Sequence, residues 1–319
     1  MSPRIAIKVR QGQRVSGGGL ALLANMNELE VERREMFSDI ADPKAIILIL
    51  QNVASAAEIR RRRYIILPQN AWPWTRDRTY NFYESRRKVM LLAASEISMR
   101  LAAGELRVGE AIPPRCHSVS AVVPNVLDLG FERSLDRAIA TDATAGSGAI
   151  ACAGTMDCYR NVERLIEAHA AYRAAGGTLR LVLGGTGLHV PDRPPPGVSL
   201  LNRFLDRSEL LGLVLSAPAV IFPSLVEASP IGALEGLELG RRVALSDIPG
   251  HRDVMGRSRP RDVLFFDPRS VAAITAALHG LESMPQTFPA TGQTDIARRS
   301  KLRELWRDEM GQALAGLAQ

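Results

Sequence analysis

Apolar and polar positions in the second half of the chain follow a regular order. Ala219–Phe222 is a short apolar run of the kind found in buried strands, and a Pro-Ser pair closes it. From Ile231 onward apolar residues recur at helical spacing, and Gly240 is typical of a helix end. Another apolar run begins at Val243. The pattern therefore predicts strand, helix and strand in succession, which is the βαβ unit of a parallel sheet.

The ends of this unit carry recognisable local signals. Ser229 is a residue type that caps helix N-termini, and Pro230 suits the first helical position, where an N–H has no helical partner. After the second strand, the residues from Asp247 to Gly250 predict a turn. The helix is therefore expected to begin at Pro230, directly after its cap.

The same kinds of pattern recur along the rest of the chain. Strands are predicted at 4–9, 45–50, 64–67, 149–153 and 179–183, and helices at 80–101, 162–174, 271–281 and 296–317. A chain of 319 residues is long enough for two domains. Residues 136–148 have the composition of a linker, so we expect one domain over 1–143 and a second over 144–295.

Two carboxylates flank the start of the helix in the βαβ unit. Glu227 precedes the helix, and Glu235 lies in its second turn. Because ionised carboxylates only accept hydrogen bonds, the pair suits a polyhydroxyl ligand such as ribose or a hexose. Gly232 has no Cβ and would let that ligand approach closely. The alternative is that Glu235 is a solvated helical residue and Glu227 an ordinary loop acid.

Composition and charge exclude several classes of protein. The 46% apolar content favours a globular chain, and the longest apolar run, Ala45–Leu50, is too short to span a bilayer. The three cysteines lack the spacing of a metal site, and the residues at the start do not resemble a signal peptide, so cytoplasm is the expected location. Nothing matches a nucleic-acid-binding motif.

The positive charge is concentrated in the first part of the chain. Residues 1–140 hold 21 Lys and Arg against 15 Asp and Glu, which accounts for the whole net charge of +6. The densest cluster is Arg60–Arg63, at the end of a predicted helix. It is either a solvated helix end or a site of attraction to an anionic membrane surface or a phosphate-linked acceptor.

The βαβ unit resembles the donor-site segment of glycosyltransferase family 4, the retaining GT-B enzymes. Their pattern is PS-x-x-E-G-F-G-L-P-x-x-E-A-x-A-x-G-x-P-V. The positions in register are Pro223, Ser224, Glu227, Leu234, Glu235, Gly240 and Val243, followed by Ser246 to Pro249 and by Asp267-Pro268. The resemblance extends to Arg160 and Asn161, which occupy the family's Lys-[Gly/Asn] positions, whereas Thr155 occupies its arginine position.

The resemblance implies two Rossmann-like doubly wound α/β domains in a GT-B fold, with the C-terminal helix over 296–319 crossing back to the first domain. It implies transfer of a hexose of mannose or glucose type from a nucleotide-diphosphate sugar to a glycan or lipid-linked acceptor, as in bacterial surface polysaccharide synthesis. No metal or separate cofactor is expected. Arg160 and Glu227 are assigned to catalysis, and donor binding to Gly17, Gly18, Gly19, Gln69, Asn70, Asn161, Gly184, Ser229, Ile231, Gly232 and Glu235.

Two other classes of protein stay open. A GT-B partner subunit without strong activity would explain Thr155, Pro230 and the absence of a histidine where relatives carry one and this chain has Gln69 and Asn70. A nicotinamide-dependent oxidoreductase is disfavoured, because the chain has no clean G-x-G-x-x-G motif with a partner acid.

Overall fold

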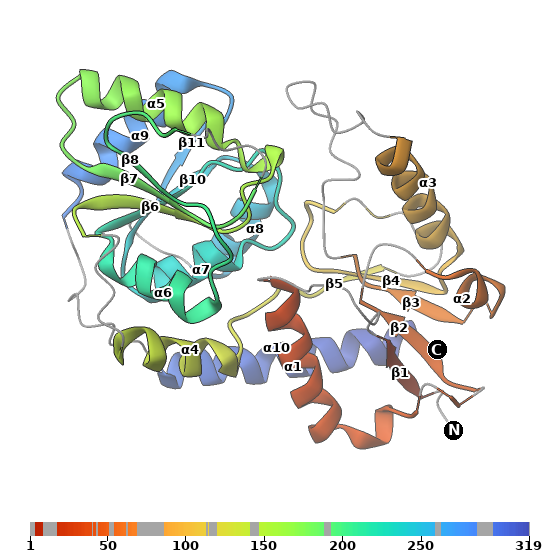
Figure 1. The fold of residues 1–319 in the computed structure, drawn as a ribbon. Coiled ribbons are helices and arrows are strands. Elements are labelled where there is room, and N and C mark those ends of the chain that lie inside the picture. Colours follow the sequence, from red (N-terminus) through yellow and green to blue (C-terminus); the bar gives the residue numbers. More distant parts are fainter. Residues whose placement is uncertain are drawn as a thin grey trace. The chain divides into compact units, whose positions relative to one another are not determined.

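The computed structural model describes residues 4–8, 18–39, 41–42, 44–50, 54–61, 63–68, 86–112, 114, 120–140, 147–187, 193–258, 263–285 and 296–318. They form two compact units (Figure 1). The first unit takes in Met1–Asp128, Glu227–Ser229 and Arg298–Gln319, and the second Leu129–Val226 and Pro230–Ala297.

The first unit contains a parallel sheet of five described strands. They are β1 (Ile5–Lys8), β2 (Ile46–Ile49), β3 (Tyr64–Ile66), β4 (Gly104–Arg107) and β5 (Ser120–Val122), paired in chain order. Four of these strands are almost wholly apolar or buried, as strands covered on both faces are. Among the described strands of this sheet, neighbours in the sheet are also neighbours in the chain.

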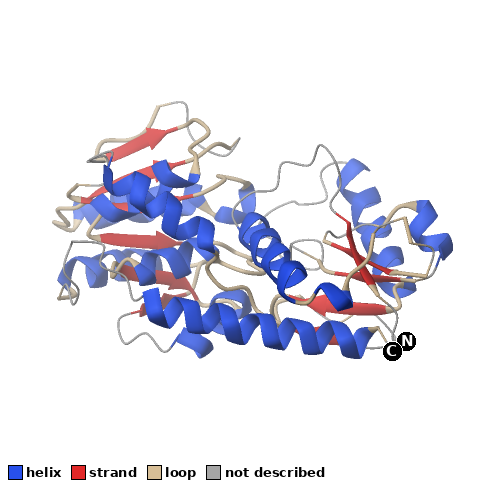
Figure 2. Cartoon of the chain, turned by 90° about the horizontal axis from the view of Figure 1, so that it is seen from below, coloured by secondary structure: helices blue, strands red, loops and turns tan. Residues whose placement is uncertain are grey.

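Helices connect and flank these strands. They are α1 (Gly18–Glu32), the 3₁₀ turn η1 (Arg34–Met36), α2 (Ala56–Arg61), α3 (Arg86–Leu101) and most of α10 (Ile296–Leu317). Figure 2 shows the helices and strands of the chain, coloured by type, in a second view. The end of α10 packs against β4 of this unit. An ideal Cβ on Gly104 of β4 would lie only 2.8 Å from the Leu317 side chain, so this glycine leaves room for the leucine.

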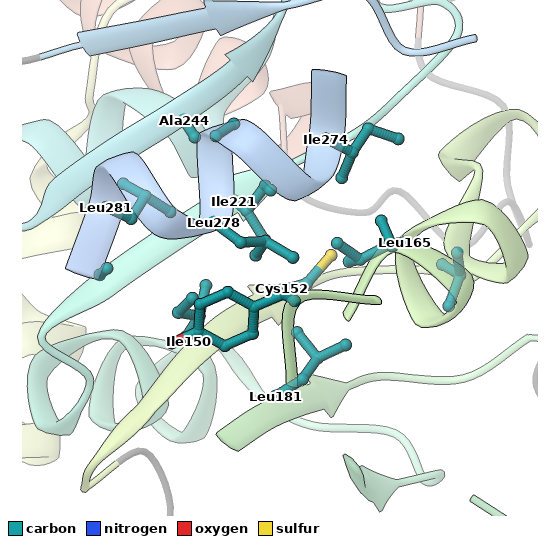
Figure 3. Close-up of a cluster of buried hydrophobic side chains, with 14 of the residues drawn as sticks. Ile150, Cys152, Leu165, Leu181, Ile221, Ala244, Ile274, Leu278 and Leu281 are labelled. Carbon is teal, nitrogen blue, oxygen red and sulfur yellow. The ribbon is translucent and has the colours of Figure 1, made fainter. Parts of the chain in front are cut away.

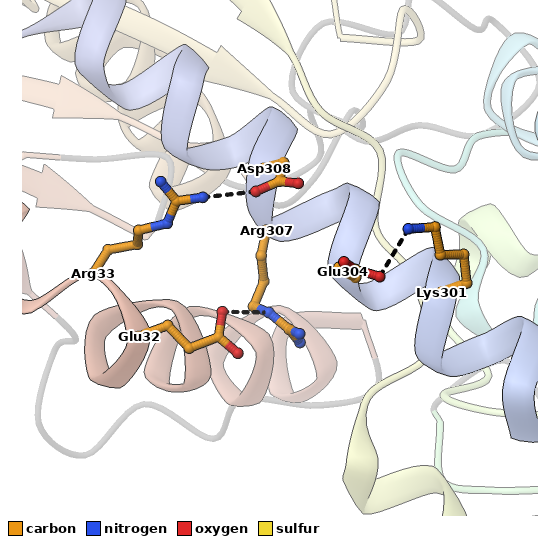
Figure 4. A network of polar contacts seen from close by, with 6 residues as sticks. All are labelled: Glu32, Arg33, Lys301, Glu304, Arg307 and Asp308. Atoms are coloured by element: carbon orange, nitrogen blue, oxygen red, sulfur yellow. Dashed lines mark hydrogen bonds and ion pairs between the residues drawn. The ribbon is translucent and has the colours of Figure 1, made fainter.

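Ion pairs join α10 to α1 within the first unit (Figure 4). Arg307 contacts Glu32 at 2.7 Å and Glu28 at 3.2 Å, and Arg33 contacts Asp308 at 2.6 Å. Glu28 and Glu32 are one helical turn apart, so they present two carboxylates to the same guanidinium. Burial raises the pKa of Glu28, with Arg307 opposing that effect.

The second unit is built on a parallel sheet whose strand order reverses. Its order is β11-β10-β9-β6-β7-β8, which is the arrangement of a doubly wound sheet. The strands are β6 (Ala149–Ala153), β7 (Arg180–Gly184), β8 (Val198–Leu201), β9 (Ala219–Phe222), β10 (Arg242–Ser246) and β11 (Val263–Phe266). The helical segments are α4 (Leu129–Ala140), η3 (Cys158–Arg160), α5 (Val162–Ala174), α6 (Arg207–Ser216), α7 (Ile231–Glu238), α8 (Pro249–Ser258) and α9 (Val271–Ser283).

Alternation along the strands of the second unit assigns each side chain to one face of the sheet. On one face, Ile150, Cys152 and Ile221 pack with Leu165 of α5 and Leu278 of α9 (Figure 3). The other face accommodates α7, because Gly236 lies over Val220 and Val243: an ideal Cβ there would be 2.8 Å from the Val220 side chain. The sheet is therefore a covered central layer, as its apolar strands predicted.

Two local predictions differ from the structure. Ser229 is not the cap of α7: Pro230 holds that position, and the helix starts at Ile231. Of the residues predicted as a turn after β10, Asp247 and Ile248 form a bend, whereas Pro249 and Gly250 start α8, since proline is acceptable in a first helical turn. The second compact unit begins at Leu129, where α4 packs against α6, and the predicted domain boundary at residue 143 stays a prediction.

Candidate functional site

The strand order of the second sheet reverses between β6 and β9, which are neighbours. From β6 the chain continues to one side of the sheet, and from β9 to the other, which makes this the topological switch point of the sheet. The loops after β6 and β9 are held together by a hydrogen bond from Leu225 N to Tyr159 O of 2.8 Å. Ligands of open α/β sheets bind at this position.

Arg160 lies at this switch point. It ends η3, in the loop after β6, and its Nη1 donates to Ser224 Oγ in the loop after β9 at 3.4 Å. Its guanidinium also lies 5.1 Å from the centre of the Tyr159 ring. A half-buried arginine is thus held at the carboxyl end of the sheet, where a cation can neutralise an anionic ligand.

Asn161 holds three loops of this edge together. Its side-chain amide donates to the backbone carbonyls of Pro223 at 3.0 Å and Pro268 at 2.7 Å, while its Oδ1 accepts from Arg164. Its backbone has φ of 60°, in the left-handed region that asparagine tolerates better than most residues. Both amide N–H groups of Asn161 are therefore used within the protein, and its predicted role in donor binding stays a prediction.

The glycine-rich loop after β7 packs against the loop after β6. Gly154 N donates to Gly184 O at 2.9 Å, and Met156 N donates to Thr186 O at 2.7 Å. Gly185 has φ of 144°, and a Cβ there would overlap the carbonyl oxygen of Gly154. Gly184 itself leaves room for Leu213 of α6. These glycines are required for the close approach of two backbone segments at the candidate site.

Glu235 on α7 is paired with an arginine that the sequence reasoning missed. Nε and Nη2 of Arg207 donate to Glu235 Oε1 at 2.9 and 2.8 Å. The pair is largely buried, with 22% of the Arg207 side chain and 12% of the Glu235 side chain exposed. Asp206-x-x-Glu209, a capping-box pattern, is the sequence signal that could have placed Arg207 in the first turn of a helix.

The start of α7 differs from the predicted ligand cradle. An ideal Cβ on Gly232 would lie 2.9 Å from the Phe222 ring, so this glycine leaves room for Phe222 of β9. Ile231 is buried, and Ser229 Oγ is a buried oxygen without a hydrogen-bond partner in the described structure. The expectation that Gly232 leaves room for a ligand on its Cβ side is therefore wrong, whereas the contact assigned to Ser229 stays a prediction.

The other predicted site residues fall into three groups. Glu227 is 9% exposed and groups with the first unit, whereas Glu235 groups with the second. Gly18 and Gly19 form the start of α1 instead of a loop. Gly17, Gln69 and Asn70 lie outside the described residues.

The described parts of the chain contain no cluster of three or more His, Cys, Asp or Glu side chains that could hold a metal ion. Across those same segments, none of the helices combines the length and apolar character required to span a bilayer.

Comparison with protein families gives a match that covers most of the second unit. Residues 147–283 match the model of the family described as glycosyl transferases group 1. The match runs from the start of the second sheet to the end of α9. The match contains the loop with Arg160, the glycine-rich loop after β7 and the helix with Glu235. Among curated protein sequences, none matches the chain significantly.

Solved structures resemble the whole chain. One is α,α-trehalose 6-phosphate synthase from Burkholderia multivorans, with a TM-score of 0.63 and 11% identity, over 100% of this chain and 97% of that one. Another is the trehalose-6-phosphate enzyme from E. coli bound with UDP-2-fluoro glucose, with a TM-score of 0.62 and 11% identity over 98% and 99%. A third is sucrose-phosphate synthase from Thermosynechococcus elongatus, with a TM-score of 0.60 and 15% identity over 95% and 80%. The chain has the GT-B fold of these glycosyltransferases.

Proposed function

We propose that this glycosyltransferase moves a hexose of glucose or mannose type from a nucleotide-diphosphate sugar to a glycan or lipid-linked acceptor, with retention of the anomeric configuration. The observation that carries the proposal is the coincidence of the group 1 match with the switch-point site of the second unit. The structural relative bound with UDP-2-fluoro glucose favours a UDP-glucose type of donor.

In this proposal the site mainly stabilises the negative charge that develops on the leaving diphosphate. Arg160 supplies a fixed cation for this charge. It acts most strongly when the glycosidic bond breaks and the diphosphate gains charge. Glu235 accepts hydrogen bonds from the ribose hydroxyls, and Glu227 from the hydroxyls of the donor sugar.

Retention of the anomeric configuration follows if the site stabilises the charge on the diphosphate and positions the acceptor. The diphosphate leaves and the acceptor attacks on the same face of the sugar, so no protein nucleophile is required. The diphosphate is already anionic and departs without protonation by a carboxylic acid. Glu227 is therefore assigned to holding the sugar, and no covalent bond to it forms.

The experiment that tests the proposal is a thermal-shift screen over nucleotide sugars, followed by turnover with the best donor. A ligand at 100 times its Kd stabilises the protein by about 2.7 kcal/mol, which such a screen detects. Release of nucleoside diphosphate with transfer to a glycan acceptor is expected. Absence of binding to any nucleotide sugar would refute the donor assignment.

A GT-B partner subunit with weak activity is the second candidate. It is favoured by Thr155, an exposed side chain at the position where the family resemblance places an arginine. Such a subunit would bind nucleotide sugar with little or no turnover. Replacement of Thr155 by Arg separates the two candidates, because an added cation should raise the turnover of an enzyme that lacks one and leave an inactive subunit unchanged.

For a lipid-linked acceptor, the proposal includes peripheral contact with an anionic membrane. Arg60 and Arg63 are exposed, and α3 has an apolar outer face: Met90 is 71% exposed and Ile97 52%, whereas Ser98 is buried. A helix with exposed apolar residues near basic ones suits the membrane interface.

Vesicle sedimentation tests this contact. Replacement of Met90 and Ile97 by Ser should weaken binding to anionic vesicles, as should replacement of Arg60–Arg63 by Ala, and salt should release the wild type. Val31, an exposed apolar residue of α1, provides a matched control as Val31→Ser. Equal binding by all variants would mean that these residues do not contact the membrane.

A further inference from the structure

Arg207 directs two hydrogen bonds to one oxygen of the Glu235 carboxylate. Both donated hydrogen bonds, 2.9 and 2.8 Å long, end on Oε1. Two N–H groups on one oxygen fix the rotation and the position of the carboxylate more tightly than one does. A carboxylate has about four lone-pair sites on its two oxygens, so it can accept from several donors at once.

The backbone and ring contacts of Arg207 fix it in place. It is the first residue of α6, directly after the cap Asp206. Asp206 accepts from Glu209 N at 2.9 Å, and Glu209 accepts from Asp206 N at 2.9 Å, so the helix start is closed by a capping box. The guanidinium of Arg207 lies 5.9 Å from the centre of the Phe131 ring of α4. Three helices of one unit therefore determine where Arg207 can reach.

The charge of Arg207 determines the hydrogen-bonding character of Glu235. A guanidinium carries its charge at neutral pH, so Arg207 meets the Glu235 side chain as the cation of an ion pair. An ionised carboxylate accepts hydrogen bonds from both hydroxyls of a ribose, whereas a protonated one presents a competing donor.

We propose that Arg207 is a positioning residue that holds the Glu235 carboxylate ready for the ribose hydroxyls of the donor, and so sets the preference for ribonucleotides over deoxyribonucleotides. This inference rests on the proposed function, which places Glu235 against the ribose. The competing assignment is that the ion pair only joins α6 to α7, in which case it affects stability alone.

The experiment measures binding by calorimetry of UDP and GDP, and of the 2′-deoxy form of whichever the wild type binds more tightly. A charge-assisted hydrogen bond corresponds to a preference of about 10-fold to 100-fold for the ribonucleotide in the wild type. Arg207→Gln should reduce this preference to near unity by weakening the ribonucleotide, with little change for the deoxynucleotide. Arg207→Lys, which keeps the charge but not the paired donors, should restore part of it.

Arg203→Gln is the matched control. Arg203 pairs with Glu209 of the same capping box at 2.7 Å, and 58% of its side chain is exposed. This variant should keep the wild-type preference. Melting temperatures of all variants are measured alongside, so that a loss of stability is separated from a loss of discrimination.

The outcomes separate this inference from the proposed function. A wild type that binds no nucleoside diphosphate would refute both. A wild type that discriminates, together with an Arg207→Gln variant that discriminates equally well, would overturn the role of Arg207 and leave the donor site standing. Loss of discrimination in Arg207→Gln but not in Arg203→Gln, with Arg207→Lys intermediate, is the result that supports it.

Discussion

Replacement of Asn161 tests whether the edge of the second sheet depends on one side chain. Asn161 donates to the carbonyls of Pro223 and Pro268 and is 7% exposed. Asn161→Ala removes two hydrogen bonds, each worth about 1 kcal/mol, and leaves two carbonyls without that donor. It also places an alanine at φ of 60°, which costs about 1 kcal/mol more. We expect a total destabilisation of about 3 kcal/mol.

Two further variants divide this value into its parts. Asn161→Gly loses the hydrogen bonds but accepts the left-handed backbone, so it should be about 1 kcal/mol less destabilising than Asn161→Ala. Asn161→Asp tolerates that backbone and has nearly the same shape, but its carboxylate cannot donate to either carbonyl. It should therefore retain the loss that comes from the missing donors.

The assay must report on the second unit alone. The three tryptophans are at 72, 74 and 306, and none falls within residues 129–297, so tryptophan fluorescence does not follow this unit. Hydrogen exchange measured on peptides that cover residues 219–226 and 263–268 does follow the second unit. A loss of about 3 kcal/mol corresponds to a fall of roughly 100-fold in protection. Wild-type protection in Asn161→Asp would refute the assignment of Asn161 as the residue that joins these loops.

The remaining predictions concern the chemistry and pH dependence. Arg160→Ala should lower turnover far more than donor affinity, and Arg160→Lys should recover much of the activity; a lysine variant as inactive as alanine would mean that the planar guanidinium itself is required. Glu227→Gln should impair but not abolish transfer, and intact-protein mass spectrometry should detect no hexose attached to Glu227; a trapped adduct would refute same-face displacement. Burial lowers the pKa of His169, whose Nε2 lies 3.1 Å from Leu179 O. Stability that depends on neutral His169 should therefore be present above pH of about 6.5 and fall as the pH drops through the lowered value, and His169→Gln should flatten this acid dependence in urea unfolding.

The sequence by itself determined the elements whose signals are local. Apolar runs and helical spacing placed β6, β9, α5 and α10 with the bounds observed. These segments are bounded by strong breakers or long enough for periodicity to dominate, and their apolar faces leave one stable conformation. The same local signals placed Arg160 and Asn161 directly after β6 and before α5.

Tertiary structure decided what the side chains at that edge contact. Asn161 was predicted to bind a ligand, but its amide bonds to carbonyls 62 and 107 residues away, which no local pattern reveals. Glu235 was correctly placed on its helix, yet its partner Arg207 lies 28 residues earlier, on a helix that the sheet order brings alongside. Gly232 was expected to leave space for a ligand, and that space is filled by Phe222. Periodicity fixes which way a residue faces within its own element, whereas its partner depends on how the strands are ordered in the sheet.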